Sequence, residues 1–192
     1  MSQVSVLDIG CSAGNPAAES ILEFIEDKRI TRLDIDPAVA PEVLHDITLP
    51  LPEELQGKFD IVVAAHVLEH IRRADVTQVL RNIVTAVREM GEVWILVPSL
   101  EWASDQIRVG RDTEVVQRVV FGNQDDPYQF NHCGFTLNAL RTHAEVCGLL
   151  VRKAYQSPRV MTLYDKQWTT VQNVVIGMRL PEPKEDPAEA IE

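Results

Sequence analysis

The chain has 192 residues, 45% of them hydrophobic, which is the length and composition of one globular domain with a sizeable core. Its formal net charge of −11 argues against a dedicated nucleic-acid binder, because an acidic surface repels phosphate backbones. The three cysteines, Cys11, Cys133 and Cys147, have neither the spacing of a disulfide framework nor that of a zinc site. No leader and no apolar run of membrane-spanning length is evident, so we expect a soluble, cytoplasmic protein.

The first half of the chain alternates apolar strands with helices. In chain order, the pattern predicts a strand at residues 4–9, a helix that begins at Asn15-Pro16, strands at 30–35, 42–45 and 59–65, a helix at 75–90 ended by Gly91, and a strand at 92–97. This alternation predicts an α/β domain with a mostly parallel sheet and helices on both faces. A sheet of this kind binds ligands at the carboxyl ends of its strands.

The second half is less regular. Residues 101–134 show no clear period except for one helix near 113–121. An amphipathic helix at 136–147 and an antiparallel pair of strands at 149–156 and 170–180 follow. Residues 181–192 are rich in Pro, Glu and Asp, and we expect a disordered acidic tail.

A glycine-containing turn, GCSAG at residues 10–14, separates the first strand from the first helix. A dinucleotide site needs glycine at three positions of such a turn, and Ser12 and Asn15 occupy two of them. The turn also matches the G-x-S-x-G elbow of α/β-hydrolases, but that elbow needs an earlier part of the sheet, and only nine residues precede Gly10. The third interpretation is a turn that passes under a ligand without a pyrophosphate.

Five segments carry a family resemblance that favours the third interpretation. VLDIGCSAG at residues 6–14 resembles motif I of the class I S-adenosylmethionine-dependent methyltransferases. LDIDP at 33–37 and HDI at 45–47 resemble the family's ribose- and adenine-binding segments, and FDIVVAAHVLEH at 59–70 looks like motif IV with its "LEH" continuation. GEVWILVP at 91–98 resembles the fifth strand, so the resemblance runs through nearly the whole folded chain.

The resemblance is closest to a bacterial group of methyltransferases associated with surface-polysaccharide genes. In that group a "GGQ" segment, a histidine and a "GFT" helix start follow the fifth strand, as residues 121–127 and 132–136 do here. Asn123 replaces the group's second glycine. The resemblance implies one Rossmann-like domain over residues 1–180, with a seven-stranded sheet in the order 3-2-1-4-5-7-6 and an antiparallel last strand.

S-adenosylmethionine is the implied cofactor and S-adenosylhomocysteine the product. Asp34 lies about 20 residues beyond the glycine turn, where a carboxylate suits the two hydroxyls of a ribose. By resemblance, Ile35 lies against the adenine, Asp46 meets its amino group and Ile47 packs on the ring. The implied cofactor-binding residues are Asp8, Gly10, Cys11, Ser12, Gly14, Asp34, Ile35, Asp46, Ile47, Ala65 and His66.

Methyl transfer from a sulfonium is an in-line displacement, so the enzyme mainly positions donor and acceptor. An oxygen or nitrogen acceptor often needs a general base, and the candidate bases are His132, His66 and His70. Tyr128 and Gln124 are candidates for the acceptor pocket. Residues 66–70 also match the H-x-x-E-H pattern of zinc peptidases, but His66 ends a strand, so we expect no metal.

The sequence predicts a cover for the pocket as well. Many relatives have helices before the first strand, whereas this chain begins almost on that strand. We therefore expect residues 101–134 to act as a lid and acceptor-binding insertion, or a second subunit of a homodimer to cover the pocket. The predicted function is methyl transfer to a small-molecule or sugar-like acceptor. The alternatives are a catalytically inactive S-adenosylmethionine-binding protein and a protein methyltransferase.

Overall fold

The computed structural model describes residues 3–12, 16–111, 113–163 and 165–181. They form one α/β domain around a seven-stranded sheet of order β3-β2-β1-β4-β5-β7-β6, as predicted. The strands are β1 (Val4–Ile9), β2 (Lys28–Asp34), β3 (Val43–Leu44), β4 (Phe59–Ala65), β5 (Val87–Pro98), β6 (Leu149–Leu163) and β7 (Lys166–Arg179). Strand β7 runs antiparallel to both of its neighbours, β5 and β6, and the other neighbouring strands are parallel.

The described helices are α1 (Pro16–Leu22), α2 (Val76–Ala86), α3 (Leu100–Arg108), α4 (Thr113–Phe121) and α5 (Leu137–Val146), with short 3-10 turns η1 (Pro37–Val39), η2 (Glu53–Leu55) and η3 (Leu68–His70). Two of the helices begin at a side-chain cap. The hydroxyl of Ser99 accepts from the backbone N–H of Trp102 at 3.1 Å, and that of Thr136 accepts from Ala139 at the same distance. Such caps satisfy an N–H group that the first turn cannot satisfy itself.

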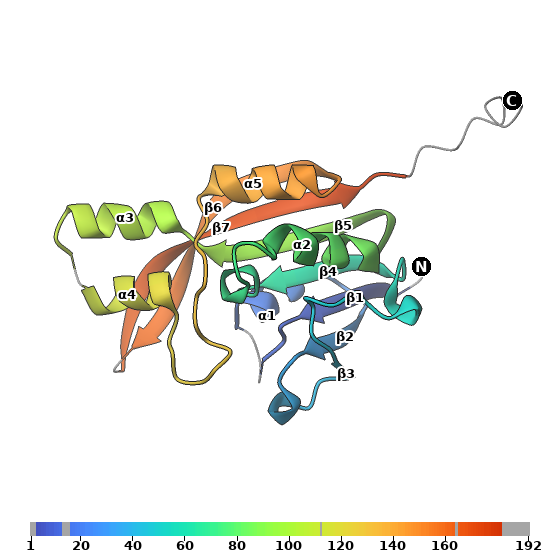
Figure 1. Ribbon diagram of the computed structural model, residues 1–192, viewed down its shortest axis with the longest axis horizontal. Coiled ribbons are helices and arrows are strands. Elements are labelled where there is room, and N and C mark those ends of the chain that lie inside the picture. Colours follow the sequence, from blue (N-terminus) through green and yellow to red (C-terminus); the bar gives the residue numbers. More distant parts are fainter. Residues whose placement is uncertain (1–2, 13–15, 112, 164, 182–192) are drawn as a thin grey trace, which may run out of the picture.

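The helices cover the two faces of the sheet unequally (Figure 1). Alternate residues of β1 supply both cores, because successive side chains of a strand point to opposite faces. Leu7 packs into the larger core, beneath α2 and α5, and Val6 packs into the smaller core beneath α1. This two-sided burial accounts for the unbroken apolar runs that mark the parallel strands in the sequence.

Helices α3 and α4 lie together beside the far end of the long β6–β7 hairpin (Figure 1). They form a small core of their own, in which Ala103 and Val119 are buried and Met161 of β6 packs against them. The prediction of a single helix in residues 101–134 was therefore incomplete. Helix α3 was not predicted, although Leu100, Ala103 and Ile107 have helical spacing, because the segment is short and most of its residues are polar.

The predicted helix end at Met90 and its stop at Gly91 were wrong. Helix α2 ends at Ala86, and Val87 already pairs with β4. Gly91 lies inside β5, where an added Cβ would lie 2.7 Å from the carbonyl oxygen of Asp60. Glycine is needed here for close approach of two strands and not for ending a helix.

Strands β6 and β7 are longer than predicted, and they bend away from the sheet toward α3 and α4 (Figure 1). Their added length brings residues 157–172 past the carboxyl ends of β4 and β5. Within the described residues, none of the helices combines the length and apolar character needed to cross a bilayer.

Candidate functional site

A cavity of about 480 Å³ opens at the carboxyl ends of the parallel strands. Its size falls in the range of about 300–1,000 Å³ that is typical of small-molecule sites. One half is lined by the turn after β1 and by the residues that follow β2 and β3. The other half is lined by residues 66–71, by the loop that follows α4, and by the β6–β7 hairpin.

The turn after β1 has an open backbone. Gly10 has a φ of +69°, and a Cβ added there would lie 2.5 Å from Cγ2 of Val67. Ser12 also has a positive φ, +50°, a backbone conformation that glycine adopts more readily than a residue with a Cβ. Gly14 lies outside the described residues. The described part of the turn therefore leaves its main chain accessible from the cavity.

Asp34 is the most firmly oriented acidic side chain in this half. It is buried, with 8% of its surface exposed, at the end of β2. Oδ2 accepts the backbone N–H of Ser12 at 2.9 Å, and Oδ1 accepts that of Asp36 at 3.0 Å. Oδ2 also accepts from the thiol of Cys11 at 3.8 Å, whereas Oδ1 has a second lone pair with which it can accept a hydrogen bond from a ligand in the cavity.

The residues after β3 combine one acidic group with apolar surface. Oδ1 of Asp46 accepts the backbone N–H of Thr48 at 2.9 Å and its hydroxyl at 2.7 Å. Ile47 is buried and Ile35, after β2, is 42% exposed, and both line the cavity. A flat apolar ring with polar groups at its edge fits such a surface.

Three of the predicted cofactor residues lie behind the cavity wall, namely Asp8, Cys11 and Ala65. All are buried, and none is among the lining residues. Burial raises the pKa of Asp8 to about 6, and its Oδ1 has no hydrogen-bond partner among the described residues. Burial, together with the nearby Asp34 carboxylate, raises the pKa of Cys11 to about 11, so this thiol is not a thiolate nucleophile at neutral pH.

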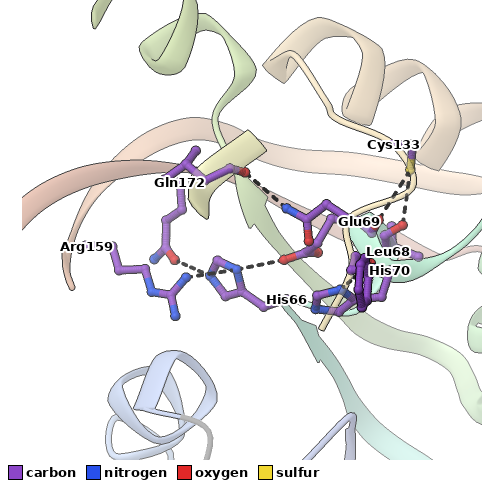
Figure 2. Close-up of polar contacts among 10 residues, drawn as sticks. His66, Leu68, Glu69, His70, Cys133, Arg159 and Gln172 are labelled. Atoms are coloured by element: carbon purple, nitrogen blue, oxygen red, sulfur yellow. Dashed lines mark hydrogen bonds and ion pairs between the residues drawn. The ribbon is translucent and has the colours of Figure 1, made fainter. Parts of the chain in front are cut away.

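The other half of the cavity centres on His66, which follows β4 in a left-handed conformation with a φ of +59°. Its Nδ1 lies 2.9 Å from Oε1 of Glu69, and its Nε2 lies 3.1 Å from Oε1 of Gln172 on β7 (Figure 2). The side chains of His66 and Glu69 are only 10% and 3% exposed. A nearly dry His–Glu pair thus faces the cavity.

Burial alone would raise the pKa of Glu69, but attraction to His66 and the hydrogen bond between them outweigh this, and the pKa is lowered. The carboxylate therefore stays ionised at neutral pH. Its Oε2 has no hydrogen-bond partner among the described residues. Arg159 of β6 completes the group, with Nη1 3.0 Å from Nδ1 of His66.

The loop between α4 and α5 is tied to the segment after β4 (Figure 2). Nδ1 of His70 lies 3.1 Å from the carbonyl oxygen of Phe130, and the thiol of Cys133 donates to the carbonyl of Leu68 at 3.3 Å. Burial, followed by the nearby Glu69 carboxylate, raises the pKa of Cys133 to about 11, so this thiol has a structural contact and no thiolate character. These contacts fix the loop over the cavity.

Among the predicted site residues, eight line the cavity: Gly10, Ser12, Asp34, Ile35, Asp46, Ile47, His66 and His70. His132 does not, because its side chain is exposed and only its backbone N–H bonds inward, to the carbonyl of Glu69 at 2.8 Å. Tyr128 lines the cavity and Gln124 does not. Across the described residues, no set of three His, Cys, Asp or Glu side chains is placed to hold a metal ion.

Sequence reasoning missed three members of the site, Glu69, Arg159 and Gln172. Glu69 belongs to the "LEH" segment, and its spacing of three residues from His66 could have suggested the pair. Arg159 and Gln172 follow no motif. They come from strands about 90 to 106 positions further along the chain, and only the sheet brings them to His66.

The comparisons with known proteins agree with this geometry. Residues 7–93, somewhat less than half of the chain, match a family model described as a methyltransferase domain. No curated protein has a sequence that matches this chain significantly.

Solved structures match over nearly the whole chain. A methyltransferase from Methanosarcina mazei, described as dependent on S-adenosylmethionine, has a TM-score of 0.64 and 14% identity over 95% of each chain. A protein solved in work on the conversion of a disulfide bond into a thioacetal group during echinomycin biosynthesis has a TM-score of 0.64 and 17% identity over 93% of this chain and 77% of that one.

A third structure carries ligands. The 1,6-didemethyltoxoflavin-N1-methyltransferase of Burkholderia thailandensis was crystallised with 1,6-didemethyltoxoflavin and S-adenosylhomocysteine. It has a TM-score of 0.61 and 15% identity over 93% of this chain and 72% of that one. The three likenesses show that this chain has the same fold as these proteins. The likeness to a methyltransferase domain in the family model lies in residues 7–93, which include the end of β1, strands β2 to β4 and the turns in the half of the cavity that follows β1, β2 and β3.

Proposed function

We propose that this protein is an S-adenosylmethionine-dependent methyltransferase that acts in line on a small-molecule acceptor, with sugar-like molecules among the candidates. The observation that carries the proposal is the geometry of Asp34. A buried carboxylate at the end of β2 is oriented by two backbone N–H groups and still has acceptor capacity toward the cavity. A vicinal diol is the group that such a carboxylate binds well.

The residues around Asp34 fit the rest of the proposed cofactor. The open backbone at Gly10 and Ser12 leaves room for a chain passing over the turn. Ile35 and Ile47 offer apolar surface for a base, and Asp46 offers an acceptor at its edge. When bound, S-adenosylmethionine supplies an electrophilic methyl group and a sulfonium charge. The carboxylates of this half of the cavity favour a cationic ligand.

His66 is the candidate base that the cavity favours. Glu69 accepts the Nδ1 proton, so Nε2 is the nitrogen that can receive a proton from an acceptor. Nε2 lies 3.1 Å from Oε1 of Gln172, an oxygen that only accepts, so Nε2 can receive a proton once an acceptor has displaced this amide or the amide has turned its NH2 group toward Nε2. His70 is the other candidate that lines the cavity, and its Nδ1 is occupied by Phe130.

Residues 101–134 are the proposed lid. Helices α3 and α4 pack on each other, and the loop that follows them lines the cavity. Within this loop, a Cβ at Gly122 would overlap the carbonyl of Gln129, so the loop is closed tightly on itself. Limited proteolysis with and without S-adenosylhomocysteine tests the lid. We expect slower cleavage within 101–134 when the ligand is present, and unchanged cleavage would contradict the proposal.

Calorimetry with S-adenosylmethionine and S-adenosylhomocysteine tests the cofactor assignment. We expect the wild type to bind both, and Asp34→Ala to lose about 1.5–3 kcal/mol of binding free energy, the scale of charged hydrogen bonds. Glu23→Gln is the matched control, because it removes an exposed carboxylate that does not line the cavity. Wild-type affinity in Asp34→Ala would show that the ribose assignment is wrong.

Turnover distinguishes an enzyme from a cofactor-binding protein without activity. A panel of small-molecule acceptors and of protein extracts can be assayed for transfer of a labelled methyl group. Transfer to small molecules that depends on His66 supports the proposal, and transfer confined to proteins would favour a protein methyltransferase. Binding of the cofactor without transfer to any acceptor would favour the inactive alternative.

A further inference from the structure

Arg159 is the one guanidinium in the cavity wall without a carboxylate in contact among the described residues. The other, Arg118, lies 3.2 Å from Glu114 and 3.8 Å from Asp125, so neighbouring carboxylates balance its charge. Within the part of the chain that the structure describes, the only hydrogen-bond partner of the Arg159 side chain is Nδ1 of His66. Arg159 is partly buried, and burial lowers its pKa, with the Glu69 charge offsetting part of that effect.

The bond from Arg159 to His66 conflicts with the bond from His66 to Glu69. Nδ1 must carry a hydrogen to donate to a carboxylate, and it must offer its lone pair to accept from a guanidinium. It cannot do both. Glu69 is ionised and buried, and an ionised carboxylate left without this donor would be strongly disfavoured. Glu69 therefore keeps the Nδ1 proton.

Arg159 is left with its donors facing the cavity. A guanidinium is always charged and presents planar pairs of N–H groups that match a carboxylate or a phosphate. A partly buried cation without a bonded anion is costly, and a ligand anion would remove that cost. In the view of Figure 2, the guanidinium and the amide of Gln172 lie on one side of the His66 ring, and Glu69 lies on the other.

The position of Arg159 separates it from the proposed cofactor half. Asp34 and Asp46 follow β2 and β3 at one end of the sheet, whereas Arg159 lies on β6 at the other end. The hairpin brings it back to His66, which follows the central strand β4. An anion on Arg159 would thus lie on the acceptor side, next to the candidate base.

We infer that the acceptor is an anionic small molecule whose carboxylate or phosphate group pairs with Arg159 while its nucleophilic atom faces His66. This inference rests on the proposed function and narrows its acceptor class. The overall charge of −11 repels anions at long range, so recognition must come from this local guanidinium.

Three probes test the inference: benzoate, phenyl phosphate and the neutral benzamide. Binding to the full chain is followed by thermal shift and calorimetry, with and without saturating S-adenosylhomocysteine. We expect at least one of the two anions to bind the wild type at least about tenfold more tightly than benzamide. The tighter of the two identifies the anionic group. Equal binding of all three probes would overturn the inference without any variant.

Arg159→Gln should lose the preference for the anion and keep its affinity for S-adenosylhomocysteine within about threefold. Arg159→Lys should retain part of the preference, because the charge remains and the planar pair of donors is lost. Arg152→Gln is the matched control, since it removes an exposed arginine from the same strand, and its anion binding should be unchanged. Retained preference in Arg159→Gln would overturn the inference.

A second pair of ligands excludes the cofactor's own carboxylate as the partner of Arg159. If Arg159→Gln weakens S-adenosylhomocysteine more than tenfold but leaves 5′-methylthioadenosine unchanged, Arg159 binds the amino-acid part of the cofactor and the inference is wrong. The two proposals can also fail separately. Anion binding that needs Arg159, in a wild type that binds no S-adenosylhomocysteine, would keep the anion site and remove the proposed function.

Discussion

The two halves of the cavity are built in opposite ways. In the half that follows β1, β2 and β3, the acidic side chains are held by backbone N–H groups: Asp46 by that of Thr48, and Asp34 by that of Asp36 and by that of Ser12 in the turn after β1. In the half around His66, side chains hold one another, and they come from three separate parts of the fold: the segment after β4, strand β6 and strand β7. The first half presents the carboxylates of Asp34, Asp36 and Asp46, whereas the second also presents the guanidinium groups of Arg118 and Arg159.

This difference indicates which half of the cavity can change its geometry, and thus its ligand, through single substitutions. A site held by backbone contacts keeps its geometry as long as its strands and their turns are kept. A site held by side chains from distant elements can be altered by a single substitution in any of them. A common cofactor suits the first kind of construction, and an acceptor that differs between related enzymes suits the second. Four predictions test this comparison, from the largest expected effect to the smallest.

Glu69→Gln should produce the largest loss of stability, about 3 kcal/mol in the free energy of unfolding, because it removes the charge that faces His66 and Arg159. Urea denaturation at pH 7 measures this. The double variant Glu69→Gln, Arg159→Gln should lose less than the sum of the single variants, since the two charges are removed together.

The pH dependence of Glu69 has a definite sign. Its pKa is lowered on folding, so its stabilisation is present above the pKa of an unfolded glutamate and is lost as the pH falls through the lowered value. In the Glu69→Gln variant, the free energy of unfolding should therefore decrease less than in the wild type as the pH falls through this range. Additive losses in the double variant would contradict a coupled acceptor half.

Asp8 should make the stability depend on pH in the opposite direction from Glu69. Its pKa is raised to about 6, so the folded state favours the neutral acid, and stability falls as the pH rises from about 4 to about 6. Asp8→Asn should remove this slope and raise the free energy of unfolding at pH 7 by up to about 3 kcal/mol, the equivalent of the shift. Thermal unfolding across pH 4 to 8 measures it.

Asp60 provides the contrast for this prediction. Its hydrogen bonds to Ser5 and its contact with Arg88 hold its pKa below the usual range, so Asp60→Asn should destabilise the protein at pH 7. An Asp8→Asn variant less stable than the wild type at pH 7 would show that the buried carboxylate has a partner. Calorimetry with S-adenosylhomocysteine then reports whether Asp8 also contributes to the cofactor half.

Gly10→Ala tests the open backbone of the cofactor half. The substitution places an alanine in the left-handed conformation, which lowers the stability by about 1–2 kcal/mol. Its Cβ would also overlap Cγ2 of Val67, so that the turn or Val67 must shift. Gly57→Ala is the matched control, with a φ of +64° and no atom within 4 Å of the added Cβ. We expect both variants to lose stability and only Gly10→Ala to lose affinity for S-adenosylhomocysteine, by about tenfold. Equal affinities would place the ligand away from the turn.

Asp46→Asn should have the smallest effect, about 1 kcal/mol in binding. If Asp46 accepts the amino group of adenine, the wild type should prefer S-adenosylhomocysteine to S-inosylhomocysteine, and the variant should lose that preference. Isothermal titration with the two ligands measures this. An unchanged preference would remove Asp46 from adenine recognition and leave that role to the backbone of this half.

The sequence predicted the elements with a strong apolar pattern and failed where the pattern was weak. The strand at residues 59–65 was found because both of its faces are buried. Helix α3 was missed because it is short and mostly polar, although its few apolar residues have helical spacing, and the end of α2 was misplaced because Gly91 serves strand packing. The pairing of His66 with Glu69 could have been predicted from their spacing of three residues. The contact of Arg159 with His66 could not, because no local sequence pattern points to it.

The sequence, through its family resemblance, predicted the order of the sheet, and it predicted Gly10, Asp34 and Asp46 on one side of the cavity, because each lies at or just after the end of a strand that the fold brings to one edge. Only the tertiary structure decided the other half. It turned His132 to solvent, placed Glu69 behind His66 and brought Arg159 from β6 into the cavity. The physical reason is the range of the contacts: neighbours in sequence are held by backbone hydrogen bonds, whereas Arg159 and His66, 93 residues apart, meet only through the pairing of β6 with β7 and of β7 with β5.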